Sequence, residues 1–275
     1  MATLRKSHLA AAVFTLSLMG PSWATSAASE TSTQDFVPTV GQSGKDVIWV
    51  PTPQALVDRM LDMAGLTPQD KLVDLGSGDG RTVITAAKRG ATARGIEYNP
   101  DMVALSRSAA LREGVSDKAV FEQADIFESD FSDATVVTLF LLPGLNLKLK
   151  PTLLDMAPGT RVVSNSFTMG EWEPDETAEA EGCSNYCTAY KWVVPAKVEG
   201  SWSTADGELV LTQKYQFAEG TLSRGGTSLP IKEGRLEGET FRFKVGDDEY
   251  TVKVAGKQML GKVNGQTDFK ASRNG

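Results

Sequence analysis

One stretch of this sequence has residue types and spacing suited to ligand binding. An acid, Asp74, is followed by Gly76, Gly78 and Gly80 at alternate positions, and Ser77 lies between the first two glycines. Glycine lets the backbone turn sharply and approach a ligand with no side chain in the way. A helix that begins after such a turn points its free N–H groups at the ligand. Residues 74–80, called the glycine loop below, therefore predict a site for a small polar molecule. The alternative is a tight turn that binds nothing.

Two further acids follow predicted strands at equivalent places. Glu97 ends the second strand of the pattern and Asp125 follows the third. In a doubly wound sheet the carboxyl ends of the strands share one edge, where ligands bind at the switch point. A carboxylate at the end of the second strand suits a ribose diol, because it accepts hydrogen bonds from both hydroxyls. We therefore expect Asp74, Glu97 and Asp125 to surround one ligand.

These acids need a sheet to position them, and the hydrophobic pattern predicts one. Short apolar segments predict strands at residues 71–75, 93–96, 119–123, 135–142 and 161–164. Helical spacing, caps and terminal glycines predict helices at residues 58–64, 82–88, 100–113 and 145–156. Because strands and helices alternate, we expect an α/β domain with a doubly wound, mostly parallel sheet over residues 47–196.

The pattern changes after residue 196. Short segments of alternating hydrophobicity follow one another, separated by turn residues such as Asp206-Gly207 and Asn264-Gly265. Residues 197–275 therefore predict a small all-β domain, an antiparallel meander that closes as a barrel or sandwich. We find no motif in it; it could bind substrate, dock to an envelope component or cap the first domain.

The first 28 residues have the three-part pattern of a secretory signal peptide. Arg5 and Lys6 precede an apolar stretch of eleven residues, 9–19, and Ser22 and Ala24 provide small residues at the two positions that a signal peptidase reads. We expect cleavage and an exported, periplasmic or envelope-associated protein, with no transmembrane span after processing. The alternative is an uncleaved leader that anchors the protein to the membrane. Residues 29–46 are rich in Ser, Thr, Gly and Gln and predict a flexible leader.

Composition excludes several kinds of chemistry. The only histidine, His8, lies in the predicted signal peptide, so the mature chain would have no Ser-His-Asp triad and no His-ligated zinc. A net charge of -7 disfavours binding to a nucleic-acid backbone. Cys183 and Cys187 are too few to build a zinc site; after export they predict one disulfide, with two free thiols as the alternative. We expect no metal site and no nucleic-acid partner.

At the glycine loop the chain resembles the class I S-adenosylmethionine-dependent methyltransferases, whose first motif is an acid followed by three alternate glycines. The dinucleotide motif G-x-G-x-x-G fits less well, because here the third glycine comes one residue too early. The resemblance implies that the loop holds the amino-acid part of S-adenosylmethionine, Glu97 the ribose, and Asp125 with Ile126 the adenine. Tyr98 could stack on the adenine or cover the sheet.

A longer ordered set of segments resembles a narrower family, the small membrane-associated protein-lysine methyltransferases of mitochondrial inner-membrane proteins and their bacterial relatives. The segments are residues 50–53, 79–81, 125–127, 139–143, 158–164 and 172–174. This resemblance implies that the methyl acceptor is a lysine of a protein. In that family the acceptor protein is embedded in a membrane. Two alternatives stay open: a small-molecule methyltransferase, and a non-catalytic binding module of the envelope, since the cofactor is made in the cytosol and the leader directs export.

A lysine acceptor must lose a proton before it can attack a methyl group. The pKa of a free lysine is about 10.4, and an apolar slot lowers it by disfavouring the ammonium form. Leu142 and Pro143 follow the fourth predicted strand at the expected ligand edge and are our candidates for that slot. We name no general base, because the Asn/Asp-Pro-Pro-aromatic motif of many amine methyltransferases is absent. Trp172 could roof the slot, but we expect it to pack against the C-terminal domain.

Overall fold

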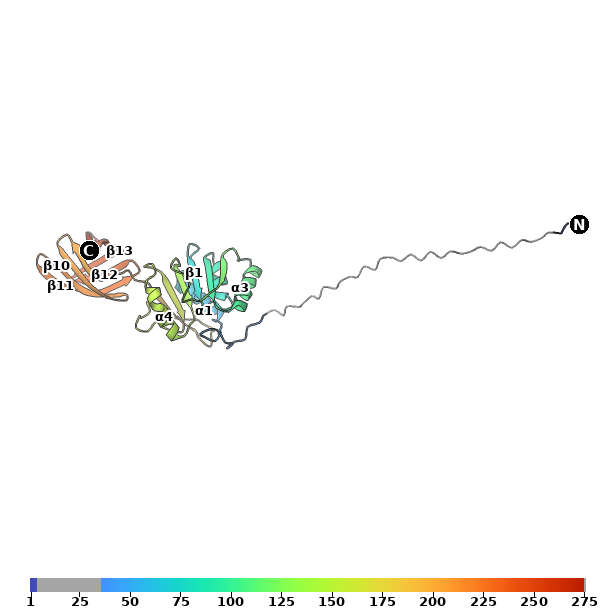
Figure 1. Cartoon of the computed structure of the whole chain (residues 1–275). Coiled ribbons are helices and arrows are strands. Elements are labelled where there is room, and N and C mark those ends of the chain that lie inside the picture. Colours follow the sequence, from blue (N-terminus) through green and yellow to red (C-terminus); the bar gives the residue numbers. More distant parts are fainter. Residues whose placement is uncertain (4–35, 275) are drawn as a thin grey trace. The chain divides into compact units, whose positions relative to one another are not determined.

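The computed structural model describes residues 1–3 and 36–274 (Figure 1). The predicted signal peptide, residues 1–28, lies outside the described residues apart from the first three. In the described part, an α/β domain is followed along the chain by a β-barrel. Among residues 36–274, the structure contains no helix with the length and apolar character of a membrane span.

A seven-stranded sheet forms the centre of the α/β domain, with the order β3-β2-β1-β4-β5-β7-β6. Its strands are β1 Lys71–Leu75, β2 Thr92–Glu97, β3 Ala119–Gln123, β4 Val136–Leu139, β5 Arg161–Asn165, β6 Glu176–Glu179 and β7 Thr188–Val193. The first five pair in parallel, whereas β7 and β6 extend the sheet in antiparallel fashion. The predicted doubly wound, mostly parallel sheet is confirmed, and its switch point lies between β1 and β4.

Helices pack on both faces of this sheet. They are α1 Gln54–Met63, α2 Arg81–Lys88, α3 Pro100–Arg112 and α4 Pro143–Leu154. Because successive strand residues face opposite sides, Leu72 joins the core with α1, α2 and α3, and Val73 joins the core with α4. The start of α3 is as predicted: the Asn99 side chain accepts a hydrogen bond from the Asp101 N–H at 2.9 Å. The cap fixes α3 directly after the end of β2.

The fourth strand is shorter than the predicted 135–142, since β4 ends at Leu139. Leu142 caps α4 and Pro143 is its first residue, where the fixed φ of proline suits a helix. The chain must therefore leave the sheet before residue 142. Leu141 is buried all the same, because it packs in the hydrophobic core with Leu149 and Leu153 of α4. Because residues beyond the end of β4 are also apolar, the sequence of residues 135–142 predicts a longer strand than the structure has.

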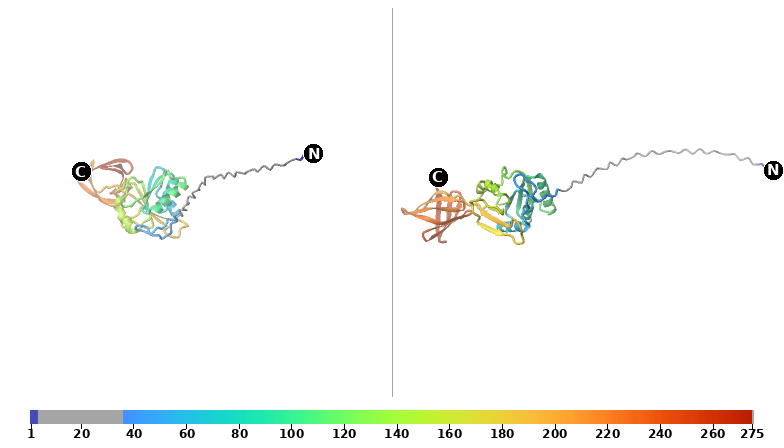
Figure 2. Two further views of the ribbon diagram at one scale, coloured as in Figure 1. Left: turned by 45° about the vertical axis from the view of Figure 1, so that its right-hand side comes forward. Right: turned by 90° about the horizontal axis from the view of Figure 1, so that it is seen from below.

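The C-terminal domain is a closed antiparallel barrel of eight strands, which confirms the all-β prediction. The strands are β8 Gly200–Thr204, β9 Gly207–Lys214, β10 Phe217–Arg224, β11 Thr227–Glu237, β12 Thr240–Val245, β13 Asp248–Ala255, β14 Gln258–Val263 and β15 Thr267–Arg273. Figure 2 shows them in orange to red, as a set separate from the first sheet. Pairing of β15 with β8 closes the barrel. Buried aromatic side chains fill its interior, with the rings of Phe243 and Tyr250 stacked at 4.5 Å.

Trp172 packs between the two domains, as expected from the sequence. Its side chain is fully buried, and its ring stacks on that of Tyr215, which follows β9, at a centroid distance of 6.2 Å. The indole N–H of Trp192 donates to the Trp172 carbonyl at 2.7 Å. Next to it, the Gln216 amide donates to the Glu173 carbonyl at 2.8 Å. The connection between β5 and β6 is thus held against the barrel.

A buried carboxylate, Asp70, ties together three strands of the sheet at their amino ends. It accepts hydrogen bonds from the Thr135 hydroxyl at 2.7 Å and from the Thr67 N–H at 2.8 Å, and it pairs with Arg161. Burial opposes ionisation, but the hydrogen bonds outweigh it and lower the pKa of Asp70. The stabilisation is therefore present at neutral pH and is lost as the pH falls through that lowered pKa.

We expect Asp70→Ala to reduce the free energy of unfolding by about 3 kcal/mol at pH 7, because it leaves Arg161 without its partner. Urea unfolding measures this. The matched control is Asp133→Ala, which breaks the exposed 3.0 Å pair with Lys71 and should change stability by less than about 1 kcal/mol. Equal effects of the two substitutions would contradict this role for Asp70.

Candidate functional site

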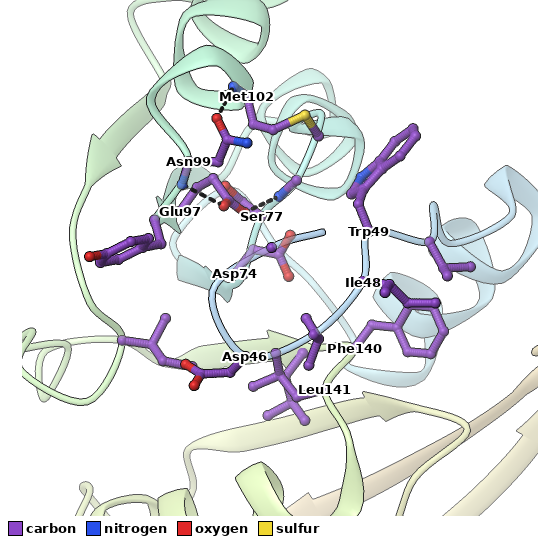
Figure 3. A pocket seen from close by; sticks show the side chains of 18 of the residues that line it. Asp46, Ile48, Trp49, Asp74, Ser77, Glu97, Asn99, Met102, Phe140 and Leu141 are labelled. Carbon is purple, nitrogen blue, oxygen red and sulfur yellow. Dashed lines mark hydrogen bonds between the residues drawn. The ribbon is translucent and has the colours of Figure 1, made fainter. Parts of the chain in front are cut away.

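A cavity of about 220 Å³ lies at the carboxyl edge of the sheet, lined by the loops that follow β1 to β4 (Figure 3). It brings together Asp74, Glu97 and Asp125, the three acids that the sequence placed at the ends of strands. Gly76, Ser77 and Gly78 line it as well. The three acids therefore line one cavity, and their contacts with a ligand stay predictions. Among the described residues no group of three or more His, Cys, Asp or Glu side chains could hold a metal ion.

Each glycine of the loop adopts a backbone conformation that other residues avoid. The φ angles are +78° at Gly76, +53° at Gly78 and +79° at Gly80, which caps α2. Space is short as well: a Cβ atom at Gly78 would lie 2.7 Å from the indole nitrogen of Trp49. At Gly80 it would lie 2.7 Å from the ring of Phe121. At Gly76 and Gly78 the loop therefore presents bare main chain to the cavity. Gly80, predicted to bind the cofactor, does not line the cavity, and its lack of a side chain leaves room for Phe121.

Asp74 lies buried beneath the glycine loop, where its carboxylate accepts a hydrogen bond from the Thr138 hydroxyl at 2.6 Å. Burial, together with the negative charges of Asp79 and Glu97, raises the pKa of Asp74 to about 7. Without a cation nearby, this carboxyl therefore changes its charge near neutral pH. A positively charged ligand group beside it would favour the ionised form.

Glu97 is held by two backbone donors, one on each carboxylate oxygen. The Gly78 N–H donates to Oε2 at 2.9 Å. The Asn99 N–H donates to Oε1 at 2.9 Å (Figure 3). The side chain thus links the glycine loop to the start of α3. Each oxygen keeps a free lone pair, so the carboxylate can still accept hydrogen bonds from a diol.

Asp125 and Ile126 lie at another part of the cavity wall, after β3. Asp125 pairs with Lys45, and that hydrogen bond, with one from the Phe127 N–H, lowers the pKa of Asp125. The Lys45 ammonium also lies 4.7 Å from the centre of the Tyr98 ring, which is 52% exposed. A ligand amino group that reached Asp125 would compete with Lys45. Tyr98 lines the cavity, so both of its predicted roles stay open.

Sequence reasoning missed the segment that lies over the glycine loop. Residues 41–49 form a small hairpin, with the Gly41 N–H donating to the Trp49 carbonyl at 2.8 Å and the Trp49 N–H donating to the Gln42 carbonyl at 2.9 Å. Residues 42–46 belong to the stretch for which we predicted a flexible leader, yet they line the cavity. The segment has no alternating pattern, so only its Ser and Gly residues hinted at a turn.

The other end of the cavity is apolar. Leu142 lines it, half-exposed, whereas Pro143 begins α4 and does not belong to the lining. The aromatic side chains of Phe140, Phe167 and Tyr186, which we did not predict, also line it. Tyr186 belongs to the loop that the Cys183–Cys187 disulfide closes.

Comparison with known proteins identifies the family. The family described as "ANTKMT methyltransferase domain" matches residues 74–176. A protein-lysine N-methyltransferase of Saccharolobus islandicus (strain REY15A) is 41% identical over 151 residues, which are 54% of this chain and 94% of that enzyme. The chain belongs to this methyltransferase family. The match ends at residue 176, before the barrel begins at Gly200.

Two further similar proteins have names that mention different substrates. The adenine nucleotide translocase lysine N-methyltransferase of Mus musculus is 40% identical over 106 residues, 38% of this chain but only 46% of the mouse enzyme. Among solved structures, an RNA methyltransferase from Salinibacter ruber in complex with S-adenosyl-L-homocysteine is 50% identical. That similarity covers 54% of this chain and 96% of the other, with a TM-score of 0.51.

The cavity fits S-adenosylmethionine, the methyl donor that this family uses. The bare backbone of the glycine loop leaves a cradle, and the buried Ser77 hydroxyl has no hydrogen-bond partner among the described residues. Glu97 can accept ribose hydroxyls, and the buried Asp74 suits a cationic amino group. The protein is a methyltransferase that depends on this cofactor, and the individual contacts of Glu97, Tyr98, Asp125 and Ile126 remain predictions.

We expect the methyltransferase to bind S-adenosylhomocysteine more tightly as the pH rises from 6 to 8, by up to about tenfold per unit below the pKa of Asp74, which is about 7. The ligand ammonium favours ionised Asp74, so binding below pH 7 releases a proton. Without ligand, the raised pKa of Asp74 has the opposite effect on folding: folding takes up a proton, so the free energy of unfolding decreases as the pH rises toward 7. Calorimetric titration in buffers of different ionisation enthalpy measures the proton release. Asp74→Asn should abolish the pH dependence, and a Kd unchanged between pH 6 and 8 in the wild type would contradict the prediction.

Proposed function

We propose that the protein is a protein-lysine N-methyltransferase that uses S-adenosylmethionine. One observation carries the proposal: a single cavity joins the acids of the cofactor site to an apolar end lined by Leu142 and aromatic rings. A lysine amine that enters an apolar end favours its neutral, nucleophilic form. The names of the Saccharolobus and mouse relatives support a lysine acceptor.

In this reaction the protein would position the methyl donor and the acceptor amine and would favour the neutral form of the amine. When bound, S-adenosylmethionine supplies a methyl group made electrophilic by its sulfonium. The glycine loop and Glu97 would hold the donor, and the apolar end would hold the neutral acceptor amine next to it. The neutral amine nitrogen would receive the methyl group of the bound donor, and S-adenosylhomocysteine would leave as the neutral thioether. The methylated nitrogen carries a positive charge after the transfer and can then release one proton to solvent.

A protein acceptor is better supported than RNA, although one solved relative is named as an RNA methyltransferase. The chain has 35 acidic residues against 28 lysines and arginines. Several of the acids line the cavity itself. Such a surface repels a phosphate backbone, which proteins bind with clustered Lys and Arg.

Methyl transfer from tritiated S-adenosylmethionine tests the proposal. Purified protein is incubated with soluble proteins, with detergent-solubilised membrane proteins, or with RNA; the membrane arm is included because the resemblance implies a membrane-embedded acceptor. We expect label in protein bands, carried by methyllysine on mass spectrometry, and lost when acceptor lysines are acetylated beforehand. Label in RNA or in small molecules would overturn a protein acceptor.

We further propose that the protein is exported by a cleaved signal peptide and is periplasmic or envelope-associated. The sequence pattern of residues 1–28 supports this, and so does the Cys183–Cys187 disulfide, because disulfides persist mainly in oxidising compartments. Cell fractionation with N-terminal sequencing tests it. We expect a mature chain that begins after Ala24 or near residues 27–28, and an intact N-terminus in the cytosolic fraction would overturn the proposal.

A further inference from the structure

Three aromatic rings from three different loops meet at the apolar end of the cavity. Phe140 follows β4, Phe167 follows β5, and Tyr186 lies between β6 and β7. The Phe140 and Tyr186 rings meet edge to face at 5.1 Å, and Phe140 and Phe167 stack at 6.1 Å. The Phe167 and Tyr186 rings lie 6.4 Å apart. Together they form one cluster, here called the aromatic wall.

The aromatic wall is continuous with the cofactor site and is open to solvent. All three rings line the same cavity as Asp74 and Glu97. Figure 3 places Phe140 and Leu141 at the end of this cavity away from Asn99 and Met102. Tyr186 is 46% exposed. An incoming side chain can therefore reach the wall from outside and extend toward the methyl donor.

The chemistry of the wall suits a lysine side chain. Ring faces pack against the four methylene groups, and their negative electrostatic face attracts an ammonium group as it approaches. The apolar surroundings then favour loss of the proton from the amine. A nucleobase would also stack on the rings, but the phosphates of its nucleic acid would be repelled by the net negative charge of this protein.

The loops that carry the wall are fixed by hydrogen bonds and by unusual backbone geometry. Asn146, fully buried in α4, donates to the carbonyls of Phe167 at 3.2 Å and of Thr168 at 3.3 Å. Ser166 and Tyr186 have φ angles of +59° and +55°, in the left-handed region that residues with a side chain seldom adopt. Such conformations persist only where the surrounding structure enforces them.

Tyr186 lies inside the loop that the disulfide closes. Cys183 and Cys187 close a loop of five residues, and Tyr186 directly precedes the second cysteine. The Ala180 N–H donates to the Cys187 carbonyl at 2.9 Å, which joins the loop to the strands on either side. With the disulfide reduced, the backbone at Tyr186 can leave its strained conformation and the ring can leave the wall.

We infer that Phe140, Phe167 and Tyr186 bind the side chain of the acceptor lysine, and that the Cys183–Cys187 disulfide holds Tyr186 in this site. The inference rests on the proposed lysine methyltransferase function and adds the residues that recognise the acceptor. It also makes recognition of the acceptor dependent on oxidation: two electrons and two protons from a thiol reductant such as dithiothreitol convert the disulfide to two thiols.

The test is steady-state methylation of a lysine-containing protein acceptor by the full chain, with S-adenosylhomocysteine affinity measured in parallel. We expect Tyr186→Ala to raise the KM for the acceptor about tenfold, and Tyr186→Phe to keep it near the wild-type value, because the ring and not the hydroxyl makes the contact. S-adenosylhomocysteine affinity should change less than about twofold in both. The control Phe217→Ala removes another exposed aromatic ring, on the barrel strand β10, and should leave KM unchanged.

Reduction provides a second, independent measurement. Dithiothreitol, or the double substitution Cys183→Ser and Cys187→Ser, should raise KM in the wild type but add nothing in Tyr186→Ala, because both act through the same ring. A KM within about twofold of wild type in Tyr186→Ala would overturn the inference, as would an additive effect of reduction in that variant. If the wild type methylates no lysine at all, the proposed function fails instead.

Discussion

Replacing Gly78 by valine is expected to weaken S-adenosylhomocysteine binding by at least about 100-fold, equivalent to about 2.7 kcal/mol. A β-branched residue at φ +53° is strained, and its Cβ would lie 2.7 Å from the indole nitrogen of Trp49. Relief of that collision must move either the hairpin of residues 41–49 or the glycine loop itself. Movement of the loop would also take the Gly78 N–H away from Glu97. Isothermal titration measures the affinity.

The control for this variant separates backbone strain from loss of the site. Gly114 follows α3 with a φ of +68°, and a Cβ there would meet nothing within 4 Å. Gly114→Val should therefore have a similar backbone cost and a similarly lowered Tm, while ligand affinity stays within about twofold. Loss of affinity in both variants would mean that general destabilisation, and not the glycine loop, explains the effect.

Much of the cofactor side of the site could be predicted from the sequence, because its signals are local. The acid and the alternate glycines lie within seven residues, and Glu97 and Asp125 are found by locating the ends of two strands. The parallel pairing of β1, β2 and β3 then brings those ends to one edge without further information. The geometry depends on the sheet, which the hydrophobic pattern predicts well.

The acceptor side could not be predicted in the same way, because its residues meet only through the tertiary fold. Phe140, Phe167 and Tyr186 come from three separate loops. Segment 139–143 contains Phe140 and Cys187 follows Tyr186, but neither pattern indicates that the rings meet. The last part of the sheet was missed for a related reason. β6 has four residues, and β7 runs antiparallel to β5 after an irregular stretch that includes the disulfide. Neither has the helix-and-strand alternation that identifies the parallel strands.

The connection between β5 and β6 links the acceptor side to the barrel. At its start, Phe167 belongs to the aromatic wall; further along, Trp172 is buried against Tyr215. Asp175, near its end, pairs with Arg235 of the barrel at 2.8 Å. One segment therefore joins the acceptor site to the C-terminal domain, so that the barrel supports the loop on which Phe167 lies.

Glu97→Ala is expected to weaken S-adenosylhomocysteine binding by about 100-fold or more, without unfolding the protein. The substitution removes an acceptor for two ribose hydroxyls, and hydrogen bonds to a charged group contribute about 1.5–3 kcal/mol each. It also leaves the Gly78 and Asn99 N–H groups without the partner that now fixes both at 2.9 Å. Titration calorimetry and the thermal shift with ligand measure the loss.

Two variants make the Glu97 prediction specific. Glu97→Gln keeps the shape of the side chain but replaces one accepting oxygen by an NH₂ donor, which must face the N–H of Gly78 or of Asn99. The glutamine variant should therefore bind S-adenosylhomocysteine nearly as poorly as the alanine variant. Glu122→Ala removes an exposed acid on β3 that pairs with Arg94 at 3.6 Å, and it should bind normally. Retained affinity in Glu97→Gln would mean that neither the charge nor the second oxygen contacts the ligand. In that case one neutral oxygen at position 97 would be enough for binding, and a carboxylate contact with both ribose hydroxyls would be contradicted.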